Sequence, residues 1–389
     1  MLECLLQRLD DAYALRLLKE MIAIPSVVGK EGALAGYIRD ELQRLGLRLE
    51  MHAVEAGRPN VYASLSAGAP GRHLILCGHT DTVPPVSGWS TDPFSPIERG
   101  DRIYGLGACD MKAGLACMLN ALRAFVESGI EFKGKLSLAA VVDEEGLSAG
   151  ARAMLGHAIV QADAILLGEP YCGDESKPIP LGLTGKILYD VRVSGKAAHG
   201  FCPELGVNAV EEAARILTHL SRLDFKPHPQ FGLGNTSTLK IEGGYSVYSV
   251  VVPAECRLEI NRLLVPGETT VEAVEDLERL VRRLNLSARV EIHTKPPRYE
   301  ACLMDPGAPI LGILDAAYRE VMGRAPVYGY ERGITDANVL MGEAGVPCIH
   351  LGPPRGAVHQ KDEYMERRWI SLLSRMYAQI AARFLEAAG

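Results

Sequence analysis

The stretch Leu76-Cys-Gly-His-Thr-Asp-Thr-Val-Pro-Pro85 joins the end of a buried strand to a polar turn. Residues 73–77 form the preceding run, which is mostly apolar and predicts a strand buried on both faces. Gly78 ends the run and is followed by His79 and Asp81. Side chains two residues apart in a strand point to the same side, so an imidazole and a carboxylate are directed at one place. Taken alone, the pattern also fits an ordinary polar turn.

Three later stretches also bring carboxylates to strand ends or turns. Asp110 lies in the glycine-rich turn of residues 104–114, which runs into an apolar helix. Glu144 and Glu145 end one predicted strand, and Glu169 ends another. In open α/β sheets, sites form at the edge where the carboxyl ends of the strands lie. The sequence therefore predicts that residues of metal-ligand type gather at one edge of a sheet.

Together with Ala357-Val-His359-Gln-Lys-Asp-Glu363-Tyr364, these stretches resemble, in order and over nearly the whole chain, the motifs of the M20 family. This family of two-metal amidohydrolases and peptidases includes acetylornithine deacetylase, succinyl-diaminopimelate desuccinylase, aminoacylase and the glutamate carboxypeptidases. The resemblance implies hydrolysis of the amide bond of an N-acyl amino acid. The alternatives are a di- or carboxypeptidase and, more remotely, a non-catalytic binding protein. The last is disfavoured because every ligand position carries a competent residue.

The resemblance also implies a site for two divalent metal ions. By position, the ligands of one ion are His79, Asp110 and Glu169, and those of the other are His359, Asp110 and Glu145, so that Asp110 bridges. One imidazole and two carboxylates for each ion leave coordination positions open, as a catalytic site requires. This mixture of nitrogen and oxygen ligands suits zinc, with cobalt or manganese as alternatives.

Two residues near these ligands are expected to take part in catalysis. Glu144 resembles the general base of the family, which would accept a proton from the attacking water and pass it to the leaving amine. Asp81 resembles the carboxylate that orients His79 from behind. The family often has a cis peptide after the bridging aspartate, which implies a cis bond between Asp110 and Met111.

Other residues are expected to contact the substrate. His199 resembles the histidine that reaches the active site of the partner subunit and helps to hold the substrate oxyanion. Arg262 resembles the arginine that binds the substrate carboxylate, and a guanidinium suits bidentate recognition of that group. Thr335 lies in a turn that matches one near the substrate carboxylate, and Arg332 beside it could add positive charge. The segment Ser249-Val-Val-Val-Pro253 lacks the asparagine common in this loop, which leaves the exact substrate open.

The pattern of predicted helices and strands indicates an α/β protein with a mostly parallel mixed sheet. Residues 182–295 instead follow a β-α-β-β-α-β order, which is typical of a ferredoxin-like module. We therefore predict a metal-binding catalytic domain from residues 1–181 and 296–389, with a dimerisation or lid domain inserted at 182–295. The inserted module implies a homodimer. Single helices are expected over residues 2–23 and 369–388.

Composition limits the possible partners of this 389-residue chain. The formal net charge is -7, which disfavours nucleic acid and anionic membranes as partners. No apolar run approaches the roughly 20 residues that cross a bilayer. Nine cysteines are scattered without CxxC spacing, which favours a reducing compartment over a disulfide framework. The sequence thus predicts a cytoplasmic enzyme acting on small N-acyl amino acids or short peptides.

Overall fold

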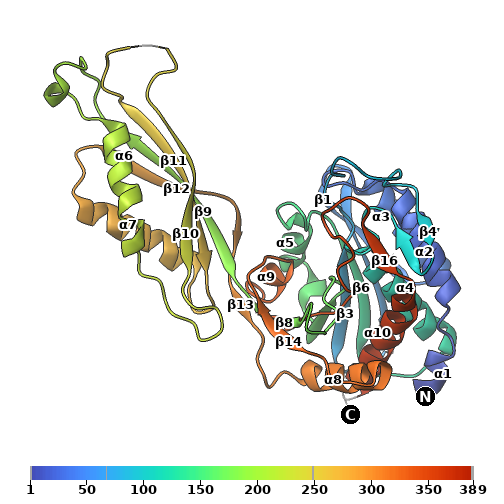
Figure 1. The fold of residues 1–389 in the computed structure, drawn as a ribbon. Helices are drawn as coiled ribbons and strands as arrows, with labels where there is room; N and C mark the ends of the chain where they lie inside the picture. Colours follow the sequence, from blue (N-terminus) through green and yellow to red (C-terminus); the bar gives the residue numbers. More distant parts are fainter. Residues whose placement is uncertain (1, 67, 248, 387–389) are drawn as a thin grey trace. The chain divides into compact units, whose positions relative to one another are not determined.

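Figure 1 shows the chain as a computed structural model, which describes residues 2–66, 68–247 and 249–386. The chain forms two compact units. Unit 1 comprises Met1–Leu181, Met304–Tyr330 and Thr335–Gly389, and unit 2 comprises Gly182–Leu303 and Glu331–Ile334. Unit 2 extends beyond residue 295 because its strand β12 (Arg289–Tyr299) continues through Pro296 and Pro297. Because β12 lies at the edge of its sheet, these prolines need not break a ladder in the sheet interior.

Unit 1 is built on a six-stranded sheet with the order β1-β2-β6-β3-β7-β15. Strand β3 lies between β6 and β7 and is parallel to both, and β15 is parallel to β7. Only β1 and β2 add antiparallel pairs, so the sheet is mixed and mostly parallel, as the sequence predicts. The strands are β1 (Arg48–Glu55), β2 (Arg58–Ser66), β3 (His73–His79), β6 (Lys135–Val141), β7 (Ala164–Leu167) and β15 (Cys348–His350).

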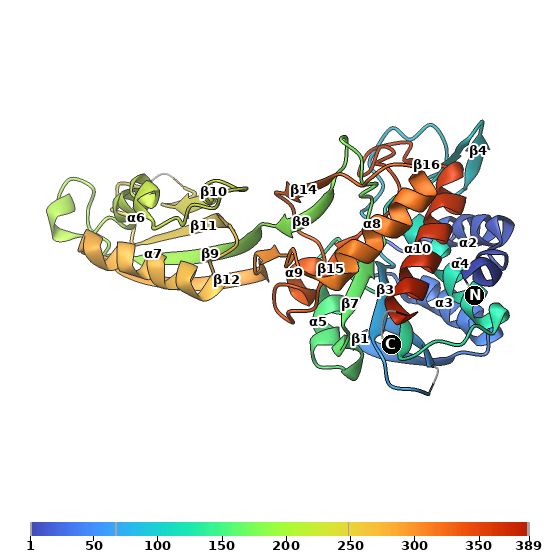
Figure 2. The same ribbon diagram turned by 90° about the horizontal axis from the view of Figure 1, so that it is seen from below.

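Helices pack against this sheet and against one another. Helices α4 and α10 both contact β3, and α8 and α10 lie side by side (Figure 2). Helix α4 approaches the sheet closely, since a Cβ at Gly114 would lie 2.5 Å from the carbonyl oxygen of Gly168. The helices of unit 1 are α1 (Leu2–Leu6), α2 (Asp11–Ala23), α3 (Gly32–Arg44), α4 (Lys112–Ser128), α5 (Ala149–Leu155), α8 (Pro309–Met322), α9 (Ala337–Leu340) and α10 (Arg368–Glu386).

The first of the two predicted terminal helices differs in the structure, and the last one is present. The single helix expected over residues 2–23 is divided into α1 and α2, because Asp10 caps the start of α2. Its carboxylate accepts hydrogen bonds from the main-chain N–H groups of Ala12 and Tyr13. The predicted final helix corresponds to α10, and residues 387 and 388 lie outside the described part of the chain.

Unit 2 contains a four-stranded antiparallel sheet with the order β10-β11-β9-β12. Along the chain the elements follow the order β9-α6-β10-β11-α7-β12, which confirms the ferredoxin-like arrangement. Their bounds are β9 (Gly185–Ser194), α6 (Ala209–Thr218), β10 (Asn235–Gly243), β11 (Glu255–Leu264) and α7 (Thr270–Leu284), with β12 given above. The inward faces of α6, α7 and the sheet form a separate hydrophobic core.

Two small sheets complete the structure. One has the order β13-β8-β14, from Cys302–Leu303, Ile179–Leu183 and Tyr328–Glu331. The other has the order β16-β5-β4, from Tyr364–Glu366, Arg102–Tyr104 and Ile97–Arg99. Short 3-10 turns occur at Ala158–Val160, Pro203–Leu205 and Leu220–Arg222. Among the described residues, no helix is both long and apolar enough to cross a bilayer.

Candidate metal centre

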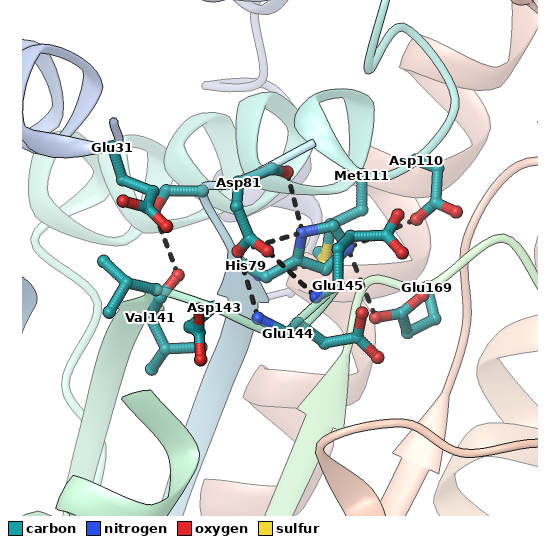
Figure 3. Close-up of polar contacts among 12 residues, drawn as sticks. Glu31, His79, Asp81, Asp110, Met111, Val141, Asp143, Glu144, Glu145 and Glu169 are labelled. Atoms are coloured by element: carbon teal, nitrogen blue, oxygen red, sulfur yellow. Dashed lines mark hydrogen bonds and ion pairs between the residues drawn. The ribbon is translucent and has the colours of Figure 1, made fainter. Parts of the chain in front are cut away.

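The candidate site lies in unit 1, at the carboxyl ends of β3, β6 and β7. Because β3 is parallel to both neighbours, the three strands end at the same edge of the sheet. His79 is the last residue of β3, the pair Glu144 and Glu145 follows β6, and Glu169 follows β7 (Figure 3). Asp110 comes from the turn that precedes α4. The topology of the sheet therefore brings these residues together.

Asp110 is shared between the two histidines of the site. Its Oδ1 lies 3.2 Å from Nε2 of His79, and its Oδ2 lies 3.5 Å from Nε2 of His359. On one side, Oε1 of Glu169 is 3.6 Å from His79 Nε2. On the other side, Oε1 of Glu145 is 2.7 Å from His359 Nε2. The structure thus places all five predicted ligands in one cluster, with a carboxylate between two imidazoles.

A grouping by distance alone divides these residues differently. Potential ligand atoms of His79, Asp110 and Glu145 lie within 4.8 Å of one another, as do those of His79, Glu144 and Glu169. The second group includes Glu144, the expected general base. The positions of the side chains alone are therefore compatible with Glu144 as either a base or a ligand, and the metal content of a variant separates the two roles.

The hydrogen bonds of His79 favour a role as a ligand. Its Nδ1 lies 3.0 Å from the main-chain oxygen of Asp81, an acceptor, so Nδ1 carries a proton that it donates. In the neutral ring, the lone pair is then on Nε2, which faces Asp110 and Glu169. A hydrogen bond that fixes the tautomer of a histidine from behind is typical of metal sites.

The electrostatics of the cluster favour bound positive charge. Burial, together with the negative charge of Glu169, raises the pKa of Glu144 well above its usual value, and burial does the same for Glu169. Hydrogen bonds to Asp110 and Glu145 raise the pKa of His359 to about 10. Burial lowers the pKa of His79, but the hydrogen bond to Asp110 and the nearby carboxylates raise it well above its usual value. Protons or divalent cations would supply the charge that these carboxylates need.

The carboxylate of Asp81 lies beside His79, as expected, but its hydrogen bonds go to other groups. It lies 3.7 Å from Nδ1 of His79, whose hydrogen bond goes to the main-chain oxygen of the same residue. The two carboxylate oxygens accept the main-chain N–H groups of Glu144, at 3.1 Å, and Glu145, at 2.9 Å. Asp81 is fully buried. Its main chain therefore orients His79, and its side chain holds the turn that carries Glu144 and Glu145.

This geometry leads to a prediction for Asp81→Asn. The side-chain NH₂ group of asparagine would face the main-chain N–H of Glu144 or of Glu145. Two donors cannot bond to each other, so the turn would lose one of its hydrogen bonds. We expect kcat to fall by about 10- to 100-fold while bound metal is retained, as is typical when a residue behind a metal ligand is replaced. Steady-state kinetics and elemental analysis of the same preparation would check this. A loss of less than about twofold would contradict the assigned role.

Asp143 also supports this turn, although it is not among the residues that the motifs predict for the site. The residue has a left-handed backbone with φ of 71°. Its carboxylate accepts the N–H of Leu147 at 3.0 Å and forms a 2.6 Å ion pair with Arg58. A residue other than glycine rarely adopts this conformation, so the surrounding contacts must hold it. The only signal in the sequence was its position directly before Glu144.

The expected substrate role of Arg262 is corrected by its surroundings. The side chain is 2% exposed and lies inside unit 2. Its guanidinium forms ion pairs with Asp276 at 2.7 Å and Glu268 at 2.9 Å, and it also donates to the main-chain oxygen of Asp224. Two buried carboxylates thus neutralise the charge. Arg262 stabilises the core of unit 2 and is not available to a substrate carboxylate in this arrangement.

Thr335 likewise has internal partners. It is 6% exposed, and its hydroxyl lies 2.9 Å from Nε2 of His350 and accepts the N–H of Ala337. These contacts place it as a structural residue at the start of α9 rather than as an exposed substrate contact. Arg332 belongs to unit 2, where its guanidinium donates to the main-chain oxygen of Phe231.

His199, expected to act at the site of a partner subunit, lies on the surface of unit 2. The residue is exposed, and its Nδ1 accepts the N–H of Phe201, so the neutral ring carries its proton on Nε2. Phe201 beside it is 83% exposed. The imidazole is thus available to a group outside its own unit.

The Asp110–Met111 peptide bond is cis, as expected.

Comparison with known proteins identifies the family. Residues 75–383 match peptidase family M20/M25/M40. An acetylornithine deacetylase of Edwardsiella ictaluri is 31% identical, with 95% of this chain and 97% of the relative covered. A succinyl-diaminopimelate desuccinylase of Methylorubrum extorquens is 30% identical, with 96% and 99% covered. A crystal structure of a dinuclear metal-binding M20 peptidase from Bacillus subtilis has the same fold, with a TM-score of 0.71, 17% identity and coverage of 97% and 99%.

The extent of these matches decides the class of protein. The family match covers more than half of the chain, and the relatives at 30% and 31% identity are covered almost completely. The chain belongs to peptidase family M20/M25/M40. It is a hydrolase that acts on amide bonds, and it carries clusters of residues that could hold metal ions.

Proposed function

We propose that this protein is a two-metal hydrolase that releases the acyl group of an N-acyl amino acid. The observation that carries the proposal is the position of Asp110, which presents one carboxylate oxygen to His79 and the other to His359. Each imidazole has a second carboxylate beside it. The similarity to a deacetylase and a desuccinylase over almost the whole chain supports the acyl amino acid as substrate.

The same geometry supports the proposed ligand set. Asp110 would be shared by two ions, one held with His79 and Glu169 and the other with His359 and Glu145. Nitrogen and carboxylate oxygen donors suit zinc, and cobalt or manganese could take its place. The Bacillus subtilis relative is a dinuclear metal-binding peptidase, which supports two ions here. Bound divalent ions would supply Lewis acidity toward the amide carbonyl and the attacking water.

Glu144 would move the proton of the reaction. Hydrolysis adds water across the amide bond, so a proton must leave the attacking water and reach the leaving nitrogen. Glu144 would accept that proton as a carboxylate and donate it as a carboxylic acid. Burial raises its pKa, which makes the carboxylate a stronger base than an exposed glutamate. Asp81 would keep Glu144 in place through the main chain of the turn.

A hydrolysis screen tests this proposal. The protein, loaded with zinc or with cobalt, is offered N-acetyl amino acids, N-succinyl amino acids and dipeptides. We expect the highest kcat/KM among the acylated amino acids. Faster cleavage of dipeptides would instead support a di- or carboxypeptidase, the alternative within the family. Absence of hydrolysis in all three classes with both metals would overturn the enzymatic proposal and favour a non-catalytic binding protein.

We also propose that the protein forms a homodimer through unit 2. Strand β10 lies at the edge of the four-stranded sheet, and it exposes apolar side chains. Leu239 is 58% exposed and Ile241 is 51% exposed. A strand edge with exposed apolar side chains is a surface on which another chain can pair. Light scattering during size-exclusion chromatography should therefore give twice the mass of one chain.

The proposed role of His199 in a partner's site predicts complementation between two inactive proteins. His199→Ala and Glu144→Gln are mixed and allowed to exchange subunits. If His199 acts across the dimer, each mixed dimer has one site with both defects and one site with neither, so activity should reappear. If His199 acts within its own chain, every site keeps one defect. Absence of activity after exchange has been confirmed by mass spectrometry of tagged subunits would contradict the shared site.

We infer a reducing, cytoplasmic location from the cysteines. All nine lie in the described part of the chain and form no disulfide there, and seven of them are buried. Burial raises the pKa of Cys117 and Cys302 to about 12, which keeps these two thiols protonated and unreactive. Such thiols are typical of proteins that do not depend on disulfides.

A further inference from the structure

Glu363 is a buried carboxylate outside the proposed ligand set, and it contacts the turn that carries Asp110. The residue is 1% exposed. Its Oε1 accepts the main-chain N–H groups of Cys109 at 2.8 Å and Asp110 at 3.0 Å, and its Oε2 accepts that of Gly107 at 3.0 Å. Its own main-chain oxygen accepts the N–H of Gly105 at 3.0 Å. One residue thus holds four N–H groups of a single turn.

The same contacts connect Asp110 to the segment that carries His359. Glu363 lies between His359 and β16, and β16 pairs with β5 just before the turn. A further hydrogen bond joins the two segments, because Sγ of Cys109 donates to the main-chain oxygen of Pro354. These contacts join the turn of Asp110 to the segment of His359, whose Nε2 lies 3.5 Å from Oδ2 of Asp110.

The chemistry of the three N–H donors requires a carboxylate. A carboxylate has two accepting oxygens and no proton, so it can accept all three hydrogen bonds. A glutamine of the same shape would direct its NH₂ group at a main-chain N–H and leave buried donors without an acceptor. Lys112, which donates from Nζ to the main-chain oxygens of Met21 and Ile24, is buried close enough that the negative charge of Glu363 partly opposes the lowering of its pKa by burial.

We propose that Glu363 is a positioning residue that presets the bridging ligand: by holding the turn of residues 105–110, it fixes Asp110 opposite His359 before metal binds. The inference rests on the proposed two-metal function, in which Asp110 is shared by both ions. A ligand that is already in place loses little conformational entropy when the metal binds, so preorganisation raises the affinity for the metal. Glu363 would affect the ions only through the main chain of Asp110.

The test compares Glu363→Gln with wild type and with a matched control. The control is Glu41→Gln, which changes a buried carboxylate of the same unit whose partners are Tyr13, Arg16 and Arg44. Zinc affinity of the metal-free proteins is measured by competition with a chelator, and the visible spectrum of the cobalt form reports the ligand geometry. We expect Glu363→Gln to bind zinc about 10- to 100-fold more weakly with an altered cobalt spectrum. Glu41→Gln should lose thermal stability but keep both properties.

The results separate the inference from the proposed function. Zinc affinity of Glu363→Gln within twofold of wild type would overturn the positioning role, even if its Tm falls. Failure of the wild-type protein to bind two ions would instead overturn the proposed metal centre. If Glu363→Gln does not fold, hydrogen exchange of the wild-type protein decides. Peptides covering residues 105–110 should be protected in the metal-free protein, and protection that appears only after zinc is added would contradict a preset turn.

Discussion

Replacing Glu144 by glutamine is expected to lower kcat by about 10²- to 10⁴-fold, the range that general acid–base catalysis contributes. Glutamine keeps the shape of the side chain, but its amide cannot accept the proton of the attacking water. Glu144 lies within reach of His79 and Glu169, where potential ligand atoms are no more than 4.8 Å apart. Its main-chain N–H is held by Asp81, so the replacement should not move the turn.

Metal content shows whether Glu144 is a base or a ligand. As a base, its replacement should leave the bound metal unchanged while kcat falls, with KM affected much less. As a ligand, the replacement should lower metal content together with activity. Kinetics and elemental analysis of one preparation measure both quantities, and circular dichroism confirms that the variant is folded. Activity within about tenfold of wild type would show that another group takes the proton.

Replacing any of the proposed ligands is expected to abolish activity, and the number of ions lost should depend on which ligand is replaced. Because Asp110 faces both imidazoles, Asp110→Ala should weaken the binding of both ions. His359→Ala should release mainly the ion shared with Glu145, and His79→Ala mainly the ion shared with Glu169. Chelation of the wild-type protein should inactivate it, and added zinc or cobalt should restore activity. Bound metal also stabilises the fold by mass action, so chelation should lower the Tm.

A separate cluster serves as the control for metal counting. Potential ligand atoms of Glu50, His52 and His157 also lie within 4.8 Å of one another. However, Nδ1 of His157 accepts the N–H of Ile159, which places the proton of the neutral ring on Nε2, the atom nearest Glu50. We therefore expect His157→Ala to bind as many ions as wild type. Full metal content in Asp110→Ala would contradict the proposed bridging ligand.

The sequence by itself determined the class of fold and the place of the site. Apolar runs that end in His79, Glu144 with Glu145, and Glu169 are local signals, because strand period and strand ends depend on neighbouring residues. A sheet with parallel central strands then brings those ends to one edge, which is where the structure has them. The ligand types could be read from the motifs for the same reason, since each motif is a short continuous stretch.

Two local features of the structure differ from what the sequence predicts. The helix expected over residues 2–23 is interrupted, because Asp10 can satisfy the free N–H groups at a helix start and so favours a new start over continuation. The proline pair in β12 did not end the strand, because β12 lies at the edge of its sheet. In both cases the structure around the residue decides whether a helix or strand ends there.

Only the tertiary structure decided which groups the polar side chains contact. Arg262 appeared suited to a substrate carboxylate, but Glu268 and Asp276 neutralise it inside unit 2. The carboxylate of Asp81 lies 3.7 Å from Nδ1 of His79, as its predicted role requires, but it also accepts the main-chain N–H groups of Glu144 and Glu145, which no motif predicts. Glu363 holds the turn of Asp110 across 253 positions of sequence. The partner of a charged side chain can be distant in sequence, and in a buried environment that partner determines the role of the side chain. A local sequence pattern therefore cannot predict it.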